Sequence, residues 1–122
     1  MIFKERVTVT TTGTAGAATG SANTKAIRGK ILRVVLNFHA SAPATTDTTI
    51  STAYPITENI LVVTSSVTDA SFYPRAKPVD NANAAITNAF TELVVDGTVT
   101  VSLAQCDALT GAVVADIYYE KN

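Results

Sequence analysis

The sequence consists of short runs in which apolar and polar residues alternate, separated by Gly, Pro, Asn or Asp. In residues 3–11, Phe3, Val7 and Val9 fall on one face, and the basic residues Lys4 and Arg6 fall on the other. A period of two residues is typical of a β-strand with one buried face. No stretch keeps the period of an amphipathic helix. The pattern therefore predicts an all-β protein.

Further strands are expected along the rest of the chain. Residues 31–40 carry apolar side chains on both faces, which indicates the most central strand of a sheet. Residues 70–79 contain Pro74 and Pro78, which cannot donate to a strand ladder, so this segment is expected at a sheet edge. Asp96–Gly97 is either a hairpin turn or the start of the strand that follows. The remaining expected strands are 48–53, 59–66, 91–105 and 112–120. These seven or eight strands predict an antiparallel β-sandwich or barrel, with residues 1–122 as a single domain.

Two segments interrupt the strand pattern. Residues 11–26, TTGTAGAATGSANTKA, have side chains too small to form a core, so we expect a Gly/Ala/Thr-rich arm or loop. Residues 80–89, DNANAAITNA, are expected to form a long loop or at most one helical turn. Such segments are commonly disordered in monomers, and neighbouring chains are the simplest means of holding them. We therefore expect a homo-oligomer.

The charges are few and unevenly distributed. Charged residues make up 16% of the 122 residues, and the net charge of −1 gives no reason to expect nucleic acid as a direct partner. Residues 1–33 nevertheless hold six of the nine basic residues and one acid, Glu5. A chain polarised in this way can present a basic patch to a partner. Arg28 and Lys30 share the strand phase of Leu32 and Val34, so we expect them to lie beyond the sheet edge. The hypothetical interface residues are Lys4, Arg6, Lys25, Arg28, Lys30, Tyr73 and Arg75.

The chain offers few candidates for catalysis or metal binding. His39, the sole histidine, lies near Ser41 and Asp47, but three residues crowded into one turn rarely align as a catalytic triad. Pro, Asp and Thr in this segment instead indicate a turn. The only cysteine, Cys106, is expected to be a buried thiol, and the scattered aspartates are expected to be turn residues. We therefore expect no enzyme activity, no cofactor and no metal. The longest aliphatic runs, such as 60–63, are too short to cross a membrane.

Three segments carry a resemblance to a known family: GKILRVVLNFHASAPATTDTTISTA (29–53), FYPRAKPVDNANAAIT (72–87) and DGTVTVSLAQCDALTGAVVADIYYE (96–120). Their order resembles that of the small decoration, or cement, proteins of tailed-bacteriophage capsids. The resemblance implies a β-sandwich or barrel, often trimeric, that bridges coat subunits on the capsid exterior after assembly in the host cytoplasm. The implied partners are the major capsid protein and further copies of this chain, with no membrane. The alternatives are a neck, tail or fibre component, or a glycan-binding adhesin-like domain; the sequence contains no Trp to form a glycan platform.

Overall fold

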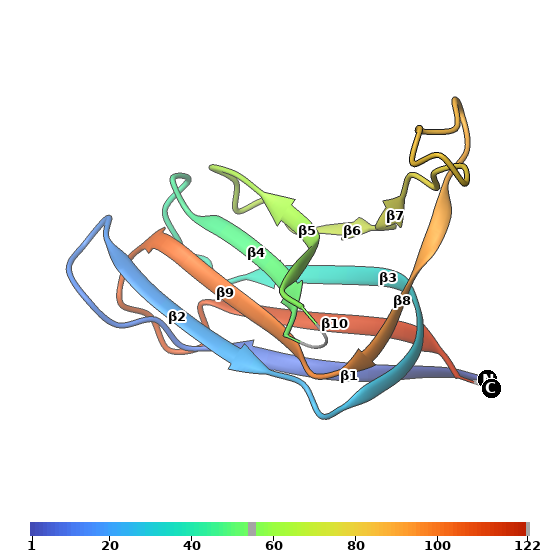
Figure 1. The fold of residues 1–122 in the computed structure, drawn as a ribbon. Helices are drawn as coiled ribbons and strands as arrows, with labels where there is room; N and C mark the ends of the chain where they lie inside the picture. The colour runs from blue at the N-terminus through green and yellow to red at the C-terminus, as the bar shows by residue number, and fades with distance from the viewer. Residues whose placement is uncertain (54–55, 122) are drawn as a thin grey trace.

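The structure is a computed structural model that describes residues 1–53 and 56–121. Two antiparallel sheets pack face to face as a β-sandwich (Figure 1). The first sheet has the order β1-β10-β3-β8-β7, with β6 also paired to β3, and the second has the order β2-β9-β4-β5. The strands are β1 Ile2–Val9, β2 Ala18–Asn23, β3 Ile27–Phe38, β4 Asp47–Thr52, β5 Glu58–Val63, β6 Ala70–Phe72, β7 Arg75–Ala76, β8 Thr91–Gly97, β9 Val99–Cys106 and β10 Val113–Glu120. The predicted all-β antiparallel sandwich is confirmed.

The described residues form ten strands, more than the predicted seven or eight. The expected edge segment 70–79 divides into β6 and β7 around Pro74, which lacks the N–H that a ladder needs. Residues 91–105 divide into β8 and β9. These two strands pair in different sheets, so Asp96–Gly97 is not a hairpin turn but the end of β8, from which the chain crosses to the second sheet. The last additional strand, β2, falls in the segment predicted to be an arm.

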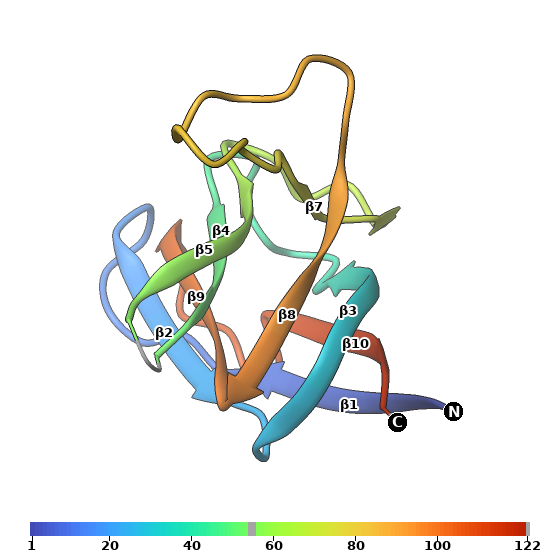
Figure 2. The ribbon, with the colours of Figure 1, turned by 45° about the vertical axis from the view of Figure 1, so that its right-hand side comes forward.

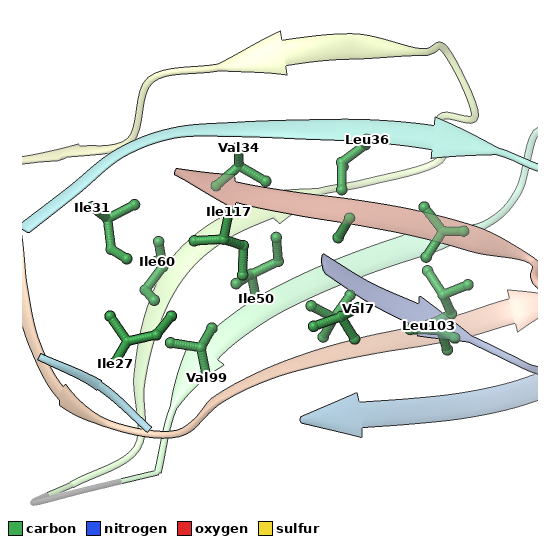
Figure 3. Close-up of a cluster of buried hydrophobic side chains, with 14 of the residues drawn as sticks. Val7, Ile27, Ile31, Val34, Leu36, Ile50, Ile60, Val99, Leu103 and Ile117 are labelled. Atoms are coloured by element: carbon green, nitrogen blue, oxygen red, sulfur yellow. The ribbon is translucent and has the colours of Figure 1, made fainter. Parts of the chain in front are cut away.

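The core lies between the sheets and is built from β-branched and aliphatic side chains. Ile27, Ile31 and Ile117 of the first sheet gather with Ile50 and Val99 of the second (Figure 3). All five are almost completely buried, as expected for inward positions of a sandwich. The predicted buried face of the first strand is confirmed for Val7 and Val9, and the alternating residues Val101, Leu103, Val113 and Ala115 are buried as well. Phe3 departs from its predicted inward place, because it lies partly exposed at the rim and stacks on Tyr119.

A β-bulge in β3 changes which residues face the core. Ile31 pairs with Tyr119 and Arg33 pairs with Tyr118, so Leu32 is an extra residue in β3. An extra residue reverses the alternation, which buries Ile31 before the bulge and Val34 after it. The predicted common strand phase of Leu32 and Val34 was therefore wrong. Arg28 and Lys30 were also misplaced beyond the sheet edge: both lie within β3, paired to β8, on the solvent face.

The segment 11–26 is not the predicted arm or loop. It contains β2, an edge strand that pairs with β9 in the second sheet, and Ala18 is fully buried. A Cβ at Gly20 would lie 2.3 Å from the carbonyl oxygen of Thr10, which shows how closely β2 passes the end of β1. Small side chains here permit close backbone packing and do not signal flexibility. The segment is held by its own chain, so it gives no support to an oligomer.

The two described ends of the chain lie side by side, and one long loop projects from the sandwich. Met1 and Lys121 exchange two hydrogen bonds of 3.1 and 3.0 Å, which places the described ends side by side (Figure 1). Residues 77–90, between β7 and β8, rise away from the sheets at one end of the sandwich (Figure 2). This segment forms the predicted long loop and contains an isolated bridge between Val79 and Ala85.

Candidate functional site

The side chains of His39, Ser41 and Asp47 are not arranged as a catalytic triad. His39 Nδ1 accepts a hydrogen bond of 3.0 Å from the backbone N–H of Ser41. The carboxylate of Asp47 instead accepts one of 2.8 Å from the backbone N–H of Ser65. Both side chains therefore satisfy backbone donors, His39 within its own turn, as the sequence predicted, and Asp47 on the distant residue Ser65.

The loop aspartates serve the same purpose. Asp69 accepts from the N–H of Phe38, Asp107 from that of Gly16, and Asp80 from those of Ala82 and Ala84, at 2.7–2.9 Å. Within the described residues, no group of three His, Cys, Asp or Glu side chains lies close enough to hold a metal ion, and no pocket is present. Cys106 is fully buried, as expected.

The outer face of the first sheet carries most of the predicted interface residues. We call it the charged face and define it by Lys4 and Arg6 on β1, Asp116, Tyr118 and Glu120 on β10, Arg28, Lys30 and Arg33 on β3, and Glu92, Val94 and Asp96 on β8. The sign of the charge alternates from strand to strand across the sheet. β1 and β3 are basic, whereas β10 and β8 are acidic.

Neighbouring strands on the charged face form ion pairs. Arg6 binds the Asp116 carboxylate through Nε and Nη2 at 2.8 and 3.0 Å. This hydrogen bonding holds the pKa of Asp116 below its usual value, although partial burial opposes the shift. Arg28 Nε lies 3.1 Å from Asp96 Oδ1, and Lys30 Nζ lies 4.0 Å from Glu92 Oε2.

These pairs correct one premise of the interface hypothesis. The sequence placed Glu5 alone among the basic residues of positions 1–33, which implied that a partner supplies the missing carboxylates. The fold instead brings acidic residues from the last third of the chain beside those cations, because β10 and β8 flank β3. Whether the charged face binds a partner remains a prediction.

Arg33 belongs to the charged face but was absent from the predicted interface. Its guanidinium lies over the ring of Tyr118, 5.6 Å from the centroid, and Nη2 donates to Ser71 Oγ at 2.8 Å. The β3 bulge is what aligns Arg33 with Tyr118. No local sequence signal reveals that alignment.

The other three predicted interface residues are not part of the charged face as defined, although Arg75 borders it as the register partner of Glu92. Lys25 is in the turn between β2 and β3, where its backbone N–H donates to the Glu5 carboxylate at 3.1 Å. Arg75 lies in the edge strand β7 and donates from Nη1 to the carbonyl oxygens of Leu32 and Pro74. Tyr73, just before β7, is 62% exposed.

Residues 73–90 present a second surface, which we call the apolar protrusion. Tyr73, Val79, Ile86 and Phe90 are all exposed here, Phe90 to 65%. Asp80 orders the tip through its two backbone hydrogen bonds. Sequence reasoning selected Tyr73 alone. The available signal was that Ile86 falls in the segment 80–89, expected to be a loop, and that Val79 and Phe90 border it, where apolar side chains cannot reach the core.

The described residues contain no helix that is long and apolar enough to cross a membrane. No protein family and no curated protein matches the sequence. Among solved structures, one described as "CBM4 structure and function" is similar to this chain, with a TM-score of 0.31 and 12% identity over 94% of this chain and 90% of that chain. A likeness this weak carries no argument about function.

Proposed function

We propose that this chain is a structural virion protein that decorates a phage capsid and stabilises it by bridging coat subunits. The observation that carries the proposal is the apolar protrusion, where four large apolar side chains are exposed on a segment that projects from the sandwich. Exposed apolar clusters of this kind mark sites of protein interaction, since burial of apolar surface stabilises a complex by about 25 cal/mol per Å².

The protrusion also has the composition of an interface centre. Tyr and Arg are enriched among residues that dominate binding energies, and Tyr73 and Arg75 lie close together in the chain at the base of the protrusion. The segment 72–87, which carries part of the resemblance to capsid decoration proteins, falls within or beside it. We propose that the protrusion docks on the major capsid protein at the capsid exterior. Weak contacts become effective there because multivalent binding of many copies adds up.

The test is binding to parent phage particles that lack this protein. The variant is Tyr73→Ser combined with Phe90→Ser, and the matched control is Val62→Ser, which removes a side chain that is 53% exposed on the second sheet. All three substituted side chains lie outside the core, so thermal unfolding should stay close to that of wild type. We expect the double variant to lose co-sedimentation with the particles, while the control binds as wild type does.

Equal binding by the double variant would contradict docking through the protrusion. The number of copies per particle separates decoration from the alternative of a neck, tail or fibre component, because a decoration protein is present in many copies. Binding to glycans on an array without any binding to particles would overturn the proposal in favour of an adhesin-like role.

A further inference from the structure

The charged face contains a row of four residues with a symmetric arrangement. Ile2, Glu120, Lys30 and Val94 lie side by side on β1, β10, β3 and β8, as the strand register shows. The two outer residues are exposed apolar side chains, 62% for Ile2 and 75% for Val94. The two inner residues carry opposite charges. The row therefore reads apolar, acidic, basic, apolar across the sheet.

The neighbouring residues of β10 and β3 continue this complementarity. Tyr118 and Arg33 are partners in the register, and their side chains already form a cation–π contact within one chain. In this second row the ring of Tyr118 on β10 lies beside the cation of Arg33 on β3. In the first row the acid Glu120 on β10 lies beside the cation of Lys30 on β3. Both rows place a cation acceptor on β10 and a cation on β3.

A two-fold axis along the strands, between β10 and β3, matches this surface with itself. The rotation exchanges β10 with β3, and it exchanges β1 with β8 at the row of Ile2 and Val94, while each row keeps its position along the strands. Glu120 then faces Lys30 of a second copy, Tyr118 faces Arg33 of the second copy, and Ile2 faces Val94 of the second copy. A surface that is self-complementary in this way is what a two-fold interface requires.

We infer that the charged face is an interface between two copies of this chain, related by this two-fold axis. The occupant is a second copy because acidic and basic strands alternate across the face, so the rotation sets the acidic strand β10 against the basic strand β3, with Glu120 opposite Lys30. A patch of one sign would repel its own copy. Aligned packing of two sheets, with strands crossing at about 30°, accommodates the geometry.

The size of the face is adequate for such a contact. β1, β10 and β3 lie side by side, and the place on the other side of β3 is taken first by β8 and then by β6. A width of four strands spaced about 4.8 Å apart and a length of about seven residues, at ~3.3 Å per residue, give about 450 Å² in projection. Side-chain relief raises the accessible area toward the ~800 Å² per partner of a standard interface. The inference does not depend on coat binding, and its two-fold symmetry differs from the trimer that the family resemblance implied.

The test is self-association of the purified chain, without particles, by analytical ultracentrifugation from 1 to 200 µM. We expect wild type to form a dimer. Lys30→Glu and Glu120→Lys should each weaken dimerisation at least tenfold, because each places like charges across the axis twice. An equimolar mixture of these two variants should dimerise again, since opposite charges then face each other only between unlike chains.

A second pair of variants tests the apolar ends of the row. Val94→Asp should also weaken dimerisation, whereas Val62→Asp, at an exposed position of the second sheet, should not. Circular dichroism checks that the variants keep the fold. A monomer at 200 µM, a trimer, or a dimer that is insensitive to the charge reversals and to Val94→Asp would overturn the inference. Failure of the wild-type chain to bind particles, with its dimerisation intact, would instead count against the proposed function alone.

Discussion

Replacing Gly20 with alanine tests whether residues 11–26 are a packed strand. The φ of Gly20 lies outside the left-handed region, so alanine meets no backbone penalty there, and the effect is purely steric. The new Cβ would lie 2.3 Å from Thr10 O and 3.0 Å from Thr10 C, both of which are backbone atoms that cannot rotate away. β2 must then move about 1 Å from the end of β1, and overpacking of this kind costs about 2–3 kcal/mol.

For a domain of this size each kcal/mol lowers the unfolding temperature by about 3–5 °C, so Gly20→Ala should lower it by about 6–15 °C. Differential scanning calorimetry measures this shift. The control is Gly16→Ala, because a Cβ at Gly16 meets nothing within 4 Å. Its φ of 77° costs an alanine about 1 kcal/mol, partly offset by the lower entropy of the unfolded chain. An unfolding temperature of Gly20→Ala equal to wild type would show that the segment is the flexible arm after all.

Three further predictions concern the core, acid stability and the histidine turn. Ile31→Ala should reduce the free energy of unfolding in urea by about 2–5 kcal/mol, whereas Val94→Ala should change it by less than about 0.5 kcal/mol; similar values would refute the bulge register. Because Arg6 lowers the pKa of Asp116, the stabilisation by this pair is present above the unfolded-state value of about 3.9 and is lost as the pH falls through the lower folded-state value. Urea titrations from pH 7 to pH 2 should therefore show a weaker acid dependence for Asp116→Asn, and an unchanged dependence would contradict the assignment. His39→Ala should reduce the free energy of unfolding by less than about 1 kcal/mol, and so lower the unfolding temperature by only a few degrees, because the residue is exposed. A large drop in the unfolding temperature would reveal a structural role that the turn does not explain.

Local patterning predicted the strands whose alternation is unbroken. In β9 and β10, Val99, Val101, Val113 and Ile117 recur at even spacing and all face the core. The period is a property of the strand itself, so no knowledge of the neighbouring strands is needed. The same reasoning correctly placed the proline-containing segment 70–79 at an edge, because proline lacks a donor wherever it occurs.

Features that depend on distant partners were not predictable. The bulge at Leu32 exists only in the pairing of β3 with β10, and it reverses the side to which Arg28 and Lys30 point. β2 has no large apolar residue to mark it as a strand, because its role is to fit closely beside Thr10. On the charged face, sequence identified Lys4, Arg6, Arg28 and Lys30, but neither Arg33 nor the acids that the fold places beside these cations.

The pairing of β1 with β10 has a consequence for how the chain folds. Arg6 and Asp116 are 110 positions apart, yet their strands are immediate neighbours. During synthesis β1 emerges early and stays without its partner until β10 has been made, so the first sheet cannot close cotranslationally from its N-terminal side. Non-local β topologies of this kind fold in milliseconds to seconds, and an unpaired strand edge is open to aggregation throughout that interval. The yield of folded protein should therefore depend more on the time between synthesis of β1 and its pairing with β10 than on the stability of the folded sandwich.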